Sequence, residues 1–176
     1  MLSLLPSVVV LGLAALAALY LVGSRRSSPE NVAERRAAAR ALVVSVCVQS
    51  VHFAEEAATG LHERLPALFG QPAIPFSFFV AFNLLWIAIW VASVPGLRLG
   101  WAGAFFAAWF LAIAGMANGI LHPLLAIVTG AYFPGLVSSP FIGGVSIWLW
   151  LRLREATRPN GAPTRVDHAR ASRIGV

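Results

Sequence analysis

The chain has 176 residues, of which 59% are hydrophobic and only 11% are charged, and all the positive charges are Arg. This composition excludes an ordinary soluble domain, in which about a quarter of the residues are charged. The net charge of +6 does not indicate a nucleic-acid partner, because the Arg residues flank apolar runs and form no basic face of their own.

Three long stretches contain no charged residue: residues 1–24, 65–97 and 99–151. About 20 apolar residues are enough for a helix to cross the hydrocarbon core of a bilayer. With a further apolar run after residue 40, the pattern predicts an all-α, polytopic transmembrane helix bundle of about five spans. In chain order we expect these spans at residues 2–22, 37–59, 74–94, 101–129 and 133–151.

The same pattern divides the chain into four parts. Residues 1–24 are predicted to form a first transmembrane helix or an uncleaved signal anchor, and residues 25–40 a basic cytoplasmic loop. Residues 41–153 form a membrane domain of four spans, and residues 154–176 a disordered cytoplasmic tail. Within the membrane domain, Pro95-Gly96 is expected to end one span. Gly115 and Gly119 form a small-xxx-small pair that favours close helix packing.

The Arg residues predict the orientation, because positively charged loops stay cytoplasmic. With five spans, every Arg except Arg64 falls on the side that holds the 25–40 loop and the tail. We therefore expect a multi-pass protein of the inner (plasma) membrane, with its N-terminus outside and its C-terminus cytoplasmic. Membrane lipid is the expected partner.

Two acidic residues lie inside an apolar span, where topology gives no reason for a charge. Glu55 and Glu56 follow His52, and Gln49 lies one turn before it. A charged side chain in the membrane costs about 2.5–3.5 kcal/mol on insertion scales, so it normally faces the bundle interior and has a partner. Helical geometry places Glu55 and Glu56 on either side of His52, so that all three could face one cavity.

Two other spans offer polar groups at a similar depth. Asn118 and His122 are four residues apart and share a helix face, and the span at residues 74–94 contributes Asn83. Counted from the expected outer ends of the spans, His52, Asn83 and His122 lie about 10–14 Å below the surface. This common level predicts a single polar site in the outer half of the bilayer.

Imidazole and carboxylate are the usual protein ligands of zinc and of non-haem iron. We expect His52, His122 and one of Glu55 and Glu56 to hold a divalent metal, zinc in preference to iron, while the other Glu activates water. Gln49, Asn83 and Asn118 would support the site. Three alternatives stay open. The cluster could be a proton or substrate path, or a structural hydrogen-bonded network, and His62 could be a further ligand or only a solvated loop residue.

The residues resemble the HXXEE domain family of small bacterial integral membrane proteins. The name describes His52-Phe53-Ala54-Glu55-Glu56, while His122 matches a further histidine of the family and Tyr132-Phe133-Pro134-Gly135 its Tyr-x-Pro-Gly motif. The resemblance covers residues 45–153. The function of the family is not established, and a membrane-bound, metal-dependent hydrolase has been suspected for it on motif grounds. The motif differs from the His-Glu-x-x-His and His-x-x-Glu-His patterns of zinc proteases in supplying only one imidazole, which makes His122 essential to a metal site.

These features favour a metal-dependent enzyme that hydrolyses a lipid or peptide bond near the outer leaflet. In such an enzyme Tyr132 would be an oxyanion donor or hydrogen-bond anchor; otherwise it is an interfacial aromatic in a turn. An iron-dependent membrane oxidoreductase would use the same ligands. A small proton-coupled transporter is the non-enzymatic alternative; five spans without an inverted repeat match it poorly, although a homodimer could supply the second repeat.

Overall fold

The computed structural model describes residues 5–159 of the chain, and within them the fold is helical apart from one short pair of strands. The elements in chain order are α1 (Leu5–Ser24), β1 (Arg25–Arg26), α2 (Val32–Thr59), α3 (Leu61–Ala67), α4 (Phe76–Leu99), α5 (Ala102–Thr129), α6 (Ser139–Ala156) and β2 (Arg158–Pro159). The predicted all-α class is confirmed.

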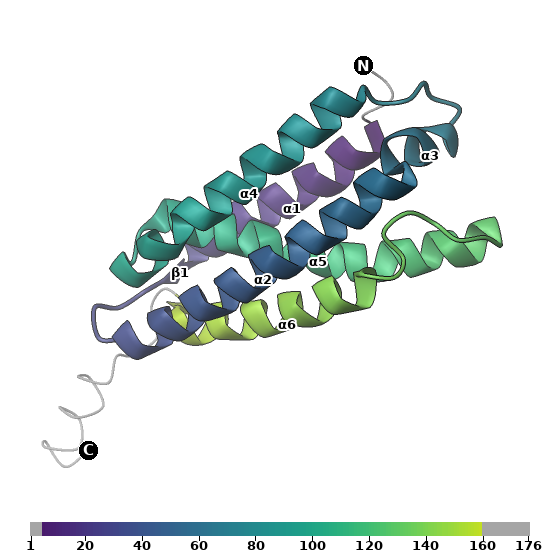
Figure 1. The fold of residues 1–176 in the computed structure, drawn as a ribbon. Helices are drawn as coiled ribbons and strands as arrows, with labels where there is room; N and C mark the ends of the chain where they lie inside the picture. Colours follow the sequence, from purple (N-terminus) through teal and green to yellow (C-terminus); the bar gives the residue numbers. More distant parts are fainter. Residues whose placement is uncertain (1–4, 160–176) are drawn as a thin grey trace, which may run out of the picture.

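The five long helices lie along one another in a single bundle (Figure 1). Helix α5 packs against α1, α4 and α6, and α2 packs against α4 and α6. Helix α3 and the loop of residues 130–138 lie at one end of the bundle, and β1 and β2 lie at the other. β1 and β2 pair antiparallel, so the segment after α1 is fixed to the end of α6.

Three helices, α2, α4 and α5, are long and apolar enough to cross a membrane. The surface of α4 agrees with this assignment, because Leu84, Leu85 and Val91 are more than half exposed. The described part of α1 is shorter than these three, and α6 carries Arg152, Arg154 and Glu155 near its end. The structure therefore describes a helical protein suited to a membrane.

Helix α2 begins at Val32, before the start of the predicted span at residue 37. Residues 32–40 are rich in Ala and Arg, both strong helix formers, so the helix extends through the segment that was predicted to be a loop. Of the predicted tail, residues 154–156 belong to α6 and Arg158–Pro159 form β2, while residues 160–176 lie outside the described residues.

Helix α4 was predicted to end at Pro95-Gly96 but continues to Leu99. It ends at Gly100, whose φ of 82° is a left-handed conformation that favours glycine. Gly96 instead permits a close approach to the next helix, because a Cβ built on it would lie 2.7 Å from the Cβ of Ala104.

Helix α6 begins at Ser139, six residues after the predicted start of its span at residue 133. The intervening backbone turns at Gly130 and Gly135, which both have positive φ, and Pro140 occupies a first-turn position that suits proline. The segment after α2, predicted to be a loop, contains helix α3. Both differences place ordered backbone over one end of the bundle.

Gly119 lies where α5 and α6 approach each other closely, as its small-xxx-small spacing predicted. A Cβ on Gly119 would lie 2.7 Å from the Cα atom of Gly143. Gly119→Ala is therefore expected to lower the free energy of unfolding by about 1–3 kcal/mol through overpacking. Gly103→Ala on the same helix is the control, because a Cβ there meets nothing within 4 Å. Thermal unfolding in detergent measures both; equal stability of the two variants would contradict the close packing.

Candidate metal centre

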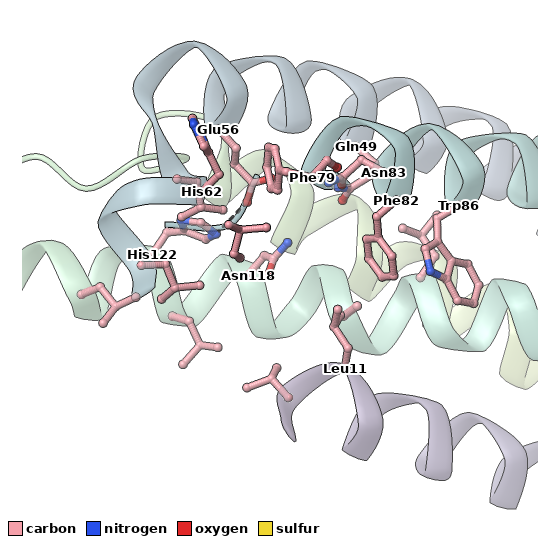
Figure 2. A pocket seen from close by; sticks show the side chains of 18 of the residues that line it. Leu11, Gln49, Glu56, His62, Phe79, Phe82, Asn83, Trp86, Asn118 and His122 are labelled. Atoms are coloured by element: carbon pink, nitrogen blue, oxygen red, sulfur yellow. Dashed lines mark hydrogen bonds and ion pairs between the residues drawn. The ribbon is translucent and has the colours of Figure 1, made fainter. Parts of the chain in front are cut away.

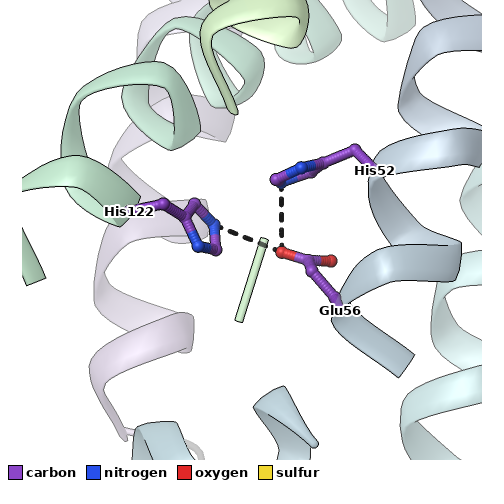
Figure 3. Close-up of side chains that lie close together, drawn as sticks. All are labelled: His52, Glu56 and His122. Atoms are coloured by element: carbon purple, nitrogen blue, oxygen red, sulfur yellow. Dashed lines mark ion pairs between the residues drawn. The ribbon is translucent and has the colours of Figure 1, made fainter. Parts of the chain in front are cut away.

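Three buried side chains from two helices meet in the bundle interior. His52 and Glu56 lie one turn apart on α2, and His122 reaches them from α5 (Figure 3). Oε1 of Glu56 lies 3.2 Å from Nε2 of His52 and 3.3 Å from Nε2 of His122. Each residue offers one ligand atom to a group whose atoms all lie within 4.8 Å of one another. This group could hold a metal ion.

The Nε2 atom of His122 carries a lone pair in the neutral ring. The other ring nitrogen, Nδ1, lies 2.5 Å from the carbonyl oxygen of Pro134. A carbonyl oxygen can only accept a hydrogen bond, so Nδ1 is the protonated nitrogen. Nε2 is then free to bind a cation, and it points at Glu56.

His52 is held in the same tautomer by a relay through Ser138. The hydroxyl of Ser138 donates to the Glu55 carboxylate, and Nδ1 of His52 lies 2.7 Å from that hydroxyl oxygen. Because the single hydroxyl hydrogen is used on Glu55, Nδ1 of His52 must be the donor to Ser138. The Nε2 lone pair of His52 therefore also faces Glu56, and it accepts a hydrogen bond from the amide N–H of Asn118 at 3.3 Å.

Two imidazole lone pairs and a carboxylate oxygen thus converge, and all three are hydrogen-bond acceptors. In a buried site such acceptors repel one another unless a metal ion or an additional proton lies between them. The separations of 3.2 and 3.3 Å match the spacing of about 3.3 Å that ligand atoms have around a tetrahedral zinc at about 2.0–2.1 Å. The two imidazole nitrogens lie within 4.8 Å of one another, so the donor set could hold a metal ion.

Glu55 lies outside this group, although the sequence predicted that it would share the cavity as a ligand or base. Its carboxylate accepts hydrogen bonds from the hydroxyl of Tyr132, the backbone N–H of Val137, and both the N–H and the hydroxyl of Ser138. Successive helix residues point about 100° apart, so Glu55 faces the 130–138 loop while Glu56 faces α5. Glu55 anchors this loop and, through Ser138, orients His52.

Tyr132 is likewise bound to Glu55 and not to the His52–Glu56–His122 group. Partial burial and the hydrogen bond to Glu55 raise the pKa of Tyr132 above its ordinary value. The phenol therefore stays protonated at neutral pH and acts as a hydrogen-bond donor to the carboxylate. The backbone carbonyl of Tyr132 also accepts a hydrogen bond from Arg64, the cation that the sequence places apart from the others.

The predicted supporting residues lie along one cavity, which also reaches the metal-ligand group. Gln49, Asn83 and Asn118 line it together with Glu56 and His122 (Figure 2). The amide of Asn83 donates back to the carbonyl of Phe79 on its own helix.

His62, predicted to be on an outer loop, lies on α3 and lines the same cavity. Its ring packs against Phe76 and Phe79, with centroids 5.0 and 6.0 Å away. Its Nδ1 is buried and has no hydrogen-bond partner among the described residues.

The sequence predicted no contact with the histidines for Gly135, which was quoted only as part of a motif, and it did not single out Ser138. Gly135 has a φ of 84°, and a Cβ on it would lie 2.7 Å from Cε1 of His122 and 2.9 Å from Cε1 of His52. The backbone of the 130–138 loop thus passes against both imidazoles, where only glycine fits. The Tyr-x-Pro-Gly motif carried a signal for Gly135, whereas Ser138 lies in an irregular segment without periodicity.

The structure thus defines a helical protein, suited to a membrane, with a buried His–Glu–His group that could hold a metal ion. No family model matches the chain, and neither the curated proteins nor the solved structures contain a match.

Proposed function

We propose that this is a polytopic membrane protein of the HXXEE type in which His52, Glu56 and His122 bind a catalytic divalent metal. Two neutral imidazoles and one carboxylate form a ligand set typical of hydrolytic zinc sites that keep an open position. The carbonyl of Pro134 and the hydroxyl of Ser138 supply the outer hydrogen bonds that orient metal-binding histidines. Zinc is the preferred metal, because two imidazoles and one carboxylate are a usual ligand set of catalytic zinc.

We further propose five spans, with α1 and α6 completing the bundle that α2, α4 and α5 form. α6 is about 27 Å long, close to the thickness of the hydrocarbon core. In the inner membrane the Arg distribution favours an external N-terminus. The metal centre, α3 and the 130–138 loop would then lie toward the outer leaflet.

The reaction that this site supports best is hydrolysis of a lipid or peptide bond. The observation that carries the proposal is the convergence of two imidazole Nε2 atoms and one carboxylate oxygen, with Glu56 and His122 lining one end of a cavity. A bound zinc would lower the pKa of water and polarise the scissile carbonyl. The second oxygen of Glu56 can accept the water proton, because Glu56 lines the cavity. Glu55 is engaged by the loop and positions His52.

The experiment is a hydrolysis assay on detergent-purified protein with fluorogenic acyl-ester and peptide substrates. We expect activity that a chelator abolishes and zinc restores, and that His52→Ala abolishes while His168→Ala in the tail leaves it unchanged. If the folded protein carries no stoichiometric metal and His52→Ala alters nothing, the proposal is wrong. Proton-coupled uptake by proteoliposomes that Glu56→Gln abolishes would favour a transporter instead.

An iron-dependent oxidoreductase is a second candidate, because two His and one carboxylate are also the ligands of mononuclear non-haem iron. A di-iron site is disfavoured, since the group contains a single carboxylate. Anaerobically purified protein with stoichiometric Fe²⁺ and no zinc would support the iron candidate.

The hydrogen bond from Nδ1 of His52 to the hydroxyl of Ser138 leads to a further prediction. Ser138→Ala removes the acceptor of its Nδ1–H bond, so we expect metal affinity to fall about 10–100-fold, as for other outer-shell changes. A chelator-dye competition assay measures the affinity. Ser139→Ala is the matched control, because Ser139 is equally buried but donates to the carbonyl of Leu136. An equal loss in both variants would indicate a general disturbance of the loop.

A further inference from the structure

A cavity of about 350 Å³ extends from the metal centre between α1, α2, α4 and α5 (Figure 2). This volume lies at the lower end of the range for small-molecule sites. Along α5 the lining runs from Leu125 to Phe110, and the part from His122 to Phe110 is about 18 Å long. The cavity is thus long, and its axis follows the helices and hence the direction of lipid chains.

The end of the cavity remote from the metal centre is apolar. Trp86 and Phe110 close it with ring centroids 4.3 Å apart, and Trp90 lies beside them. The indole N–H of Trp90 is already bonded to the carbonyl of Ala107 at 3.0 Å, so Trp90 has no free donor for a ligand. Of the polar lining residues, Glu56, His62 and His122 lie at the metal-centre end, whereas Gln49, Asn83 and Asn118 lie between that end and the aromatic end.

The apolar character of the aromatic end favours a lipid over a peptide as the substrate. A peptide carries an N–H and a carbonyl at every residue, and these groups would be left unpaired at the aromatic end at a large cost. A hydrocarbon chain has no such groups. Its carbonyl alone would need polar partners, and these lie at the metal-centre end.

The sides of the cavity give a route from the bilayer. Helices α1 and α4 both pack on α5, but in the described part of the chain they make little direct contact with each other. Leu11 of α1 and Phe78 and Phe82 of α4 line the cavity on either side of this gap, and both Phe side chains are more than a third exposed. A lipid chain could enter sideways between the two helices.

We infer that the cavity binds one long acyl chain of a membrane lipid, with its tail at Trp86 and Trp90 and its carbonyl at the metal centre. The inference rests on the proposed function and gives it a substrate class, an acyl ester or amide. In the reaction a water oxygen bonds to the acyl carbon, the bond from that carbon to the head-group oxygen or nitrogen breaks, and the water proton passes to the leaving atom. The products are a fatty acid and a lipid or head group with a free hydroxyl or amine.

The test is photo-crosslinking with palmitic acid that carries a diazirine at its methyl end, followed by peptide mapping. We expect adducts around Trp86, Trp90 and Phe110, and displacement by unlabelled palmitate but not by a hydrophobic tetrapeptide amide. Adducts only at lipid-facing residues such as Leu84, Leu85 and Ile120, or displacement by the peptide, would overturn the inference.

Two Phe substitutions test whether the crosslinked chain lies inside the cavity. Ala114→Phe fills the cavity from α5 and should abolish the internal adducts, whereas Ala88→Phe on the exposed face of α4 should leave them. If Ala114→Phe fails to fold, the wild-type map decides alone. Because the experiment runs on chelator-treated protein, it is independent of the metal. If adducts form at the cavity residues but the protein binds no metal, only the proposed function is contradicted. If the protein binds metal but adducts form only at lipid-facing residues, only this inference is contradicted.

Discussion

Glu56→Gln is expected to lower metal affinity by more than about 100-fold, because loss of a ligand charge exceeds the 10–100-fold cost of outer-shell changes. Gln keeps the size of the side chain but replaces the carboxylate that lies 3.2 and 3.3 Å from the two imidazole nitrogens. Its amide can donate to the Nε2 of His122, which lies 3.3 Å from the Glu56 carboxylate. The metal-free variant should therefore unfold at the same temperature as metal-free wild type or at a higher one. Equilibrium dialysis and thermal unfolding measure the two quantities.

The stability readout separates a metal site from a buried ion pair. If Glu56 instead formed a charge pair with a protonated His, its replacement would leave a buried charge unpaired and cost about 3–5 kcal/mol. Such a loss in the metal-free protein would contradict the proposal. Glu63→Gln is the control, because the Glu63 side chain is 68% exposed and lies on the next helix; it should leave metal affinity unchanged.

Gly135→Ala is expected to disrupt the centre although residue 135 is not a ligand. The added Cβ would lie 2.7 Å from Cε1 and 2.8 Å from Nδ1 of His122. Overpacking of about 1–3 kcal/mol adds to about 1–2 kcal/mol for a non-glycine residue in the left-handed region. We expect a drop in the free energy of unfolding of that order, and a loss of metal binding because both imidazoles must move.

Gly130→Ala is a matched control for the cost of placing a non-glycine residue in the left-handed region. Gly130 has a φ of 64° in the same loop, but a Cβ on it meets nothing within 4 Å. The control should show only the conformational cost and keep metal affinity. Metal titration of both variants decides, and unchanged affinity in Gly135→Ala would mean that the loop does not lie against the imidazoles.

The helical class and the meeting of α2 with α5 could be predicted from the sequence because both depend on regular periodicity. The four-residue spacings of His52 with Glu56 and of Asn118 with His122 place each pair on one helix face. Counting residues from the span ends then placed both histidines at a similar depth. The structure brings His52, Glu56 and His122 together.

The 130–138 loop could not be predicted, since irregular backbone has no period. The hydrogen bonds from this loop to the Glu55 carboxylate direct that side chain away from Glu56. The sequence shows that Glu55 and Glu56 are neighbours but not which way the Glu55 side chain points. Helix ends were also missed where local signals compete. Pro95-Gly96 indicated a stop, yet the helix continued to a glycine at residue 100 that can adopt positive φ.

The most direct test of the central claim is the metal content and X-ray absorption spectrum of zinc-treated, detergent-purified protein. One zinc per chain is expected, bound by two imidazole nitrogens at about 2.0–2.1 Å and a carboxylate oxygen at about 2.0–2.2 Å. His122→Ala should remove it. Folded protein that retains no stoichiometric zinc or iron, or a metal whose ligand shell contains no imidazole, would contradict a metal centre at His52, Glu56 and His122.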